Sequence, residues 1–100
     1  MAIPEDILNR IEQDFQAQAT QALSLIEKAL GTDSFCFFSP RQLRCAVFVA
    51  RGDLGVLQQA LQLGLTDCRD LMLWGEYSVH DGKYVRQHDW NLPFEPVKVS

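Results

Sequence analysis

Apolar residues recur at three- and four-residue spacing along four stretches of the chain, and this spacing predicts four helices. We place them at about 4–30, 39–51, 53–63 and 66–76. From residue 77 the helical spacing stops, and the tail 77–100 contains aromatic residues and two prolines. The pattern therefore predicts a mainly α, compact four-helix domain over residues 1–100, closed by a partly irregular, aromatic C-terminal tail.

The first predicted helix is unusually long. Glu5 and Asp6 follow Pro4, as is typical of a helix start, and Gly31 ends the pattern. A helix of this length would span ~39 Å at ~1.5 Å per residue, more than a compact domain of this size requires. A break near Ala19–Thr20 and packing against a second chain both remain open.

The stretch from Ser39 to Gly52 predicts the central helix. Ser39 suits the N-cap, Pro40 suits the first helical position, and Gln42 can complete a capping box. Apolar residues cover roughly 200° of the circumference of this helix, whereas a surface helix needs a narrower stripe. We therefore expect neighbours on several of its sides.

The next two helices are bounded by capping residues and glycines. Asp53 can cap the third helix, Gly64 is expected to end it, and Thr66 can cap the fourth. In the tail, Asp81-Gly82 lies between short apolar stretches, a signal typical of a hairpin turn. A short β-hairpin and an irregular loop both remain open there.

Near the end of the chain, Trp90, Leu92 and Phe94 are expected to pack onto the helices as apolar plugs.

The net charge indicates which classes of partner are favoured, and the cysteine content indicates the cellular compartment. The net charge of −4 disfavours binding to nucleic acid and anionic membranes and mildly favours a basic partner. Cys36, Cys45 and Cys68 are an odd number without a Cys-x-x-Cys spacing, which fits a reducing compartment. Because neither an export signal nor a membrane-length apolar run is recognisable, we expect a cytoplasmic protein without a membrane anchor.

One candidate contact surface lies on the central helix. Arg41, Arg44 and Arg51 share a face of it, with Phe48 among them. Arginines so placed can grip phosphate or carboxylate, so weak nucleic-acid or anion binding is one alternative. In an acidic chain we favour ion pairs between these arginines and acids of the first helix, Asp53 or the tail.

A second candidate surface is aromatic. Trp74, Tyr77 and Trp90 are residue types that anchor protein interfaces. Burial of the tail against the last helix explains them without a partner, and we favour it.

The tail also contains two histidine–aspartate pairs, His80-Asp81 and His88-Asp89. These side chains could ligate a metal or act in acid–base chemistry, so a metal-dependent or hydrolytic enzyme is a further alternative. Neither pair has an established metal-ligand spacing, and we favour surface histidines. No phosphate-binding loop or nucleophile elbow is present, so no cofactor is expected.

Three short motifs resemble a known family. They are Ser39-Pro-Arg-x-x-Arg-Cys45, Phe48-x-Ala-x-Gly-Asp-Leu54 and Asp67-x-Arg-Asp-x-x-x-Trp-Gly-Glu-Tyr77. Together they resemble a small family of uncharacterised bacterial proteins, over about half of the chain. The resemblance implies a bacterial, cytoplasmic origin and brings no activity or site residue.

These observations favour a non-enzymatic protein. We expect a small protein-binding or regulatory module, monomeric or homodimeric, whose partner is another protein. One concrete form of this hypothesis is an immunity-type protein that neutralises a basic toxin, which the acidic charge permits.

Overall fold

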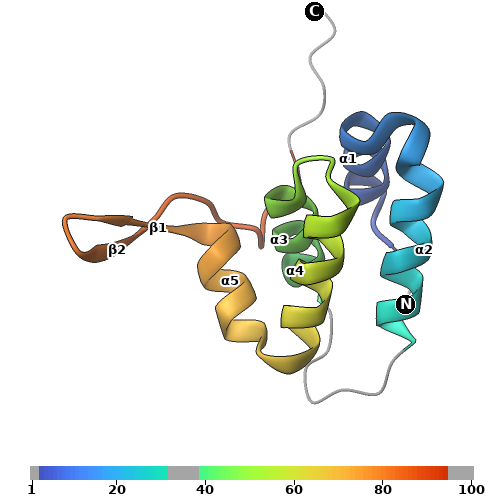
Figure 1. Cartoon of the computed structure of the whole chain (residues 1–100). Coiled ribbons are helices and arrows are strands. Elements are labelled where there is room, and N and C mark those ends of the chain that lie inside the picture. The colour runs from blue at the N-terminus through green and yellow to red at the C-terminus, as the bar shows by residue number, and fades with distance from the viewer. Residues whose placement is uncertain (1–2, 32–38, 95–100) are drawn as a thin grey trace, which may run out of the picture.

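The computed structural model describes residues 3–31 and 39–94, which form a mainly helical fold with a short two-stranded antiparallel sheet (Figure 1). The predicted fold class is confirmed, and residues 95–100 of the predicted tail lie outside the described residues. In chain order the elements are α1 (Glu5–Phe15), the short 3-10 helix η1 (Gln16–Gln18), α2 (Ala19–Leu30), α3 (Pro40–Ala50), α4 (Leu54–Thr66), α5 (Cys68–Glu76), β1 (Tyr77–His80) and β2 (Lys83–Arg86).

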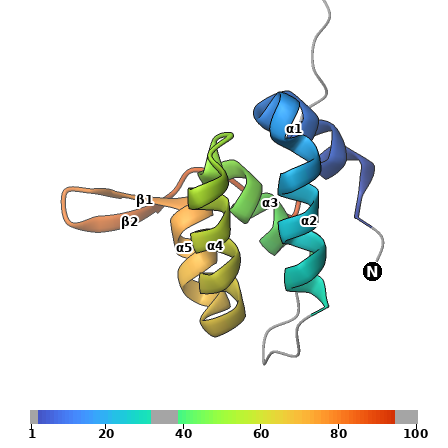
Figure 2. The same ribbon diagram turned by 45° about the vertical axis from the view of Figure 1, so that its right-hand side comes forward.

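The helix predicted over about 4–30, for which a break near Ala19–Thr20 remained open, is broken at Gln16–Gln18. It is two helices, α1 and α2, which lie side by side and run in opposite directions (Figures 1 and 2). Gln16, between them, adopts a positive φ of 50°, and this departure from helical geometry ends α1 shortly before the position suspected from the sequence. Because α2 reverses direction, the apolar faces of both helices contact the same core, whereas a single straight helix would extend beyond it. The buried side chains of the two helices are Ile7, Ile11, Phe15, Ala22, Ile26 and Ala29.

The central position of α3 is confirmed, because α1, α4 and α5 all pack against it. Its capping box is present: the Ser39 N–H donates to Gln42 Oε1 over 2.8 Å, and the Gln42 N–H donates to Ser39 Oγ over 3.4 Å. The apolar side chains of α3 that are buried are Leu43, Cys45, Ala46, Val47 and Ala50.

The turn after α3 depends on a glycine. Arg51 and Gly52 adopt φ values of 48° and 80°, and α3 ends at Ala50, one residue earlier than predicted. Gly52 also lies directly against the backbone of Asp14 in α1, where a β-carbon would overlap the Asp14 carbonyl oxygen. Both the left-handed conformation and the close approach therefore require glycine.

The predicted boundary between the third and fourth helices is wrong by a few residues. Gly64 does not end α4, which continues through this buried glycine to Thr66. Thr66 is not a cap, because its hydroxyl donates to backbone oxygens one turn earlier. Asp67 caps α5 instead, accepting from two backbone N–H groups of the first turn. A glycine inside a helix costs only ~1 kcal/mol, which packing of α4 against α3 and α5 outweighs.

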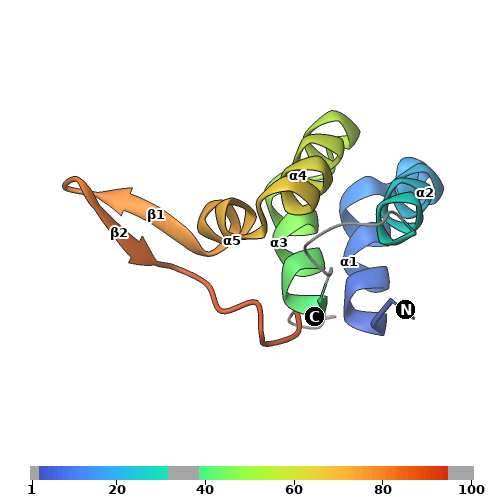
Figure 3. The ribbon, with the colours of Figure 1, turned by 90° about the horizontal axis from the view of Figure 1, so that it is seen from below.

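The hairpin alternative for the tail is confirmed. β1 and β2 pair antiparallel, with Val79 opposite Tyr84 and His80 opposite Lys83. The turn residues Asp81 and Gly82 have φ values of 51° and 75°, the two positive angles that a type I′ turn needs. The hairpin continues from the end of α5 and projects away from the helices, and the chain then returns to α3 (Figure 3).

Candidate functional site

Two of the three candidate arginines are committed to ion pairs within the fold. Arg41 donates to the Glu76 carboxylate through Nε over 2.8 Å and through Nη2 over 2.6 Å. Glu76 lies at the end of α5 and its side chain is fully buried. This bidentate pair joins α3 to α5, so Arg41 is not available as a free anion-binding group.

Glu76 also holds the segment that follows the hairpin. Its Oε2 accepts from the Trp90 N–H over 3.1 Å, and its Oε1 lies 3.4 Å from Arg86 Nη2. Burial raises the pKa of this carboxyl, but the hydrogen bonds from Arg41 and Trp90 outweigh that effect and bring the pKa below its ordinary value. The carboxylate is therefore held ionised where α3, α5 and the returning chain meet.

Arg44 makes a second, similar arrangement. It donates to Asp6 of α1 through Nε over 2.8 Å and Nη2 over 3.1 Å, and its Nη1 donates to the Trp90 carbonyl oxygen over 3.1 Å. Asp6 accepts in addition from the Phe94 N–H over 3.1 Å. The hydrogen bond from Arg44 is the main reason that the pKa of Asp6 is lowered. Residues 87–94, which we call the strap, are thus fastened to the bundle at Trp90 and at Phe94.

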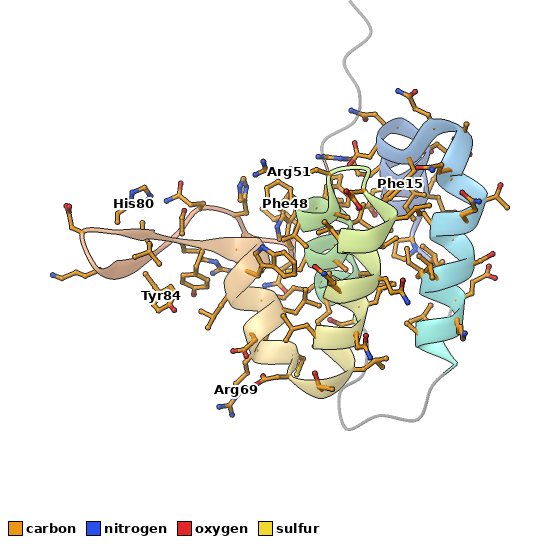
Figure 4. The ribbon with its side chains drawn as sticks, viewed as in Figure 1. Phe15, Phe48, Arg51, Arg69, His80 and Tyr84 are labelled. Atoms are coloured by element: carbon orange, nitrogen blue, oxygen red, sulfur yellow. The ribbon has the colours of Figure 1, made fainter. Side chains whose placement is uncertain are left out.

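Arg51 does not share a helix face with the other two arginines, because it lies past the end of α3 in a left-handed conformation (Figure 4). An open cleft of about 550 Å³ is lined by Arg41 and Arg44 at the start of α3. Since carboxylates already neutralise both guanidinium groups, the cleft does not support an anion site.

An aromatic cluster fills the space between α3 and the strap. Phe48 contacts His88 and Trp90, with ring centroids 4.6 and 5.0 Å apart. Trp90 also contacts the buried Phe94 and donates from Nε1 to the Gly75 carbonyl oxygen over 2.9 Å. Phe48 and Trp90 therefore hold the strap in place.

The prediction that Leu92 is also an apolar plug is wrong, because 62% of it is exposed. Leu92 is the last residue of a turn, in which its N–H donates to the Asp89 carbonyl oxygen. This turn directs the Leu92 side chain outward.

The four residues of the two histidine–aspartate pairs each make different local contacts and do not form one site. The His88 ring stacks on Trp90, and the His80 ring lies 3.5 Å from the Gln87 amide. Asp81 forms the hairpin turn, and Asp89 accepts from Asn91 and Arg86. In the described part of the chain, no three histidine, cysteine or carboxylate side chains are grouped so that they could share a metal ion.

The exposed apolar side chains gather on α5 and the hairpin. Val79 and Tyr84, which face each other across the strands, are 60% and 65% exposed. Figure 4 shows Tyr84 on the side of the hairpin toward which α5 extends and His80 on the opposite side. We call the exposed side chains of α5 and of the Tyr84 face the hairpin surface, and its members are Leu73, Trp74, Val79 and Tyr84. Val85, which pairs with Ser78, lies on the opposite face of the strands.

The hairpin surface includes one of the aromatic residues singled out from the sequence and lies beside another. Trp74 belongs to it, and Tyr77, which is half-buried, begins β1. The third, Trp90, packs in the strap instead. The exposure of Val79, Tyr84 and Val85 was not predicted, because alternation along a strand does not show whether a sheet has a helix on its face.

The structural role of Glu76 was not predicted from the sequence. One signal was present: a carboxylate in the last turn of a helix opposes the helix dipole, which favours cations there. An acid in that position suggests that arginines reach it from elsewhere in the fold.

Comparison with protein-family models, with curated proteins and with solved structures finds no match to this chain. Among the described helices, none has the length and apolar character needed to cross a bilayer. The candidate site is therefore inferred from the geometry of the structure alone.

Proposed function

We propose that the protein is a protein-binding module that contacts its partner through the hairpin surface. The observation that carries this proposal is the exposure of large apolar side chains on an element that projects from the bundle. Their exposed fractions correspond to on the order of 400 Å² of surface, within the range of the largest patch that a monomer usually exposes. Patches of this size mark interaction sites.

The alternative surfaces are less suited to a partner. The arginines of α3 are paired with Asp6 and Glu76, and the rings of Phe48 and Trp90 pack within the fold. By contrast, nothing in the described chain covers the distal half of the hairpin, and all four residues of β2 are exposed. The hairpin surface thus combines aromatic and aliphatic anchors with access from solvent.

The test is a quantitative pull-down from the lysate of the native host with the tagged full chain. We expect at least one protein in stoichiometric amount with the wild-type chain and with Leu92→Lys, and its loss with Tyr84→Lys. Leu92 is a matched control, because it is an apolar residue of nearly the same exposure that lies in the strap. Equal recovery with Tyr84→Lys and the wild type would refute the proposed surface.

A further inference from the structure

We propose that the hairpin surface binds a second copy of this chain, by antiparallel pairing of the outer edge of β1 with the same edge of its partner. This inference rests on the proposed function and names the occupant of its surface. The two copies would be related by a twofold axis near Val79, so that two hairpins form one four-stranded sheet.

The sheet of the described chain consists of β1 and β2 alone, so each strand has one edge without a neighbouring strand. A two-stranded hairpin is marginally stable in water unless more strands or a helix complete it. Because Val79 and Tyr84 remain exposed, the bundle does not complete the distal half of this hairpin.

The two edges of the hairpin differ in their charged residues. β2 begins with Lys83 and ends with Arg86, and charged residues at an edge strand oppose pairing with another chain. β1 has the sequence Tyr-Ser-Val-His, with neither a charged residue nor a proline. The edge of β1 is therefore the edge at which no charged residue or proline opposes pairing.

The backbone pairing within the hairpin sets the register in which a second copy can pair. His80 and Lys83 flank the two-residue turn and form the closing pair, so the alternation of an antiparallel ladder turns the backbone N–H and C=O of Val79 outward. A partner strand centred on Val79 would place Val79 beside its copy and Ser78 opposite His80. This register opposes no like charges, and it puts Tyr77, Val79 and Tyr84 of both copies on one face.

The charge of the chain favours the hairpin as the contact between two copies. The chain as a whole carries a net charge of −4, so two copies repel each other. The hairpin carries Lys83 and Arg86 against Asp81, a local net charge of +1, and is the end by which two copies meet with least repulsion.

The test begins with the oligomeric state of the full chain. Light scattering coupled to gel filtration from about 1 to about 200 µM is expected to show a monomer that becomes a dimer as concentration rises. We expect Val79→Lys to weaken the dimer at least about tenfold, because the substitution is present on both sides of the axis. Leu92→Lys is expected to change it less than about twofold. Circular dichroism spectra confirm that each variant is folded.

Amide hydrogen exchange of the wild-type chain tests the edge without any substitution. The Val79 amide is expected to exchange more slowly as the dimer forms, whereas the amides of Tyr84 and Arg86, which the same alternation turns to the outer edge of β2, are expected to exchange at an unchanged rate. Protection confined to β2, or a dimer that Val79→Lys does not weaken, would overturn the proposal.

A chain that stays monomeric throughout the concentration range would also overturn it. The pull-down separates this result from a failure of the proposed function. A monomer whose captured partner is lost with Tyr84→Lys contradicts only the self-association, whereas a monomer that captures nothing contradicts both.

Discussion

Replacing the buried carboxylate of Glu76 by an amide is expected to lower the free energy of unfolding by about 2–4 kcal/mol. The carboxylate accepts from Arg41 over 2.8 and 2.6 Å and from the Trp90 N–H over 3.1 Å. Glu76→Gln keeps the shape but replaces one acceptor oxygen by a donor, which then faces other donors. Breaking a buried ion pair costs ~3–5 kcal/mol, and here the cost is smaller because solvent reaches part of the Arg41 guanidinium. The exposed fraction of the Arg41 side chain is 31%.

This loss is large for a chain of 100 residues. Small domains unfold with ~5–15 kcal/mol, and the expected loss corresponds to a fall of roughly 10–25 °C in melting temperature. Urea unfolding followed by circular dichroism measures it. Asp70→Asn is the matched control, because Asp70 is an exposed acid in the same helix, and its loss is expected to stay below ~1 kcal/mol.

The pH dependence of stability gives a second test of the role of Glu76. Burial raises the pKa of Glu76, but the hydrogen bonds from Arg41 and Trp90 leave it below the ordinary value of 4.5, so the unfolded chain binds this proton more tightly than the folded chain. The resulting stabilisation is complete above pH 4.5 and is lost as the pH falls through the folded pKa. The difference in stability between wild type and Glu76→Gln is therefore expected to shrink between about pH 5 and pH 3. A loss no larger than that of Asp70→Asn, or a difference independent of pH, would refute the reasoning.

Three further predictions follow from local geometry. Gly52→Ala is expected to cost at least ~3 kcal/mol in urea unfolding, because it adds a β-carbon at a positive φ against the backbone of Asp14. The Cys45 thiol, whose pKa burial raises to about 12, is expected to resist alkylation at pH 8 until denaturant unfolds the chain, as peptide mapping by mass spectrometry would show. Phe94→Ala is expected to lower the melting temperature by about 10 °C or more, since the ring is buried, whereas Leu92→Ala is expected to change it by less than about 3 °C; equal effects would contradict the described packing of the strap.

The parts of the fold that the sequence predicted are those fixed by local signals. Ser39 and Asp53 were identified as helix caps, and both side chains accept the expected backbone hydrogen bonds. Asp81-Gly82 was identified as a possible hairpin turn because few other residue pairs adopt two positive φ angles readily. In each case the residue types themselves favour the observed backbone conformation.

The parts that the sequence did not predict depend on contacts between distant segments. The reversal at Gln16 has neither glycine nor proline to indicate it, and it results from packing of α1 and α2 on one core. The Arg41–Glu76 pair joins residues 35 positions apart, and composition alone does not assign a given arginine to a given acid. The exposure of Tyr84 likewise depends on where the whole hairpin lies.

The hydrogen bond between Asp6 and Phe94 joins residues 88 positions apart, so it can form only after all five α-helices of the described chain have been synthesised. During synthesis α1 is made well before Phe94 is added. The bundle can assemble around α3 before that, but the strap can fasten it only when nearly all of the described chain has emerged. We therefore expect nascent chains that lack the strap to be less stable than chains that contain it. Such nascent chains are the form that proteases and chaperones are expected to bind most often.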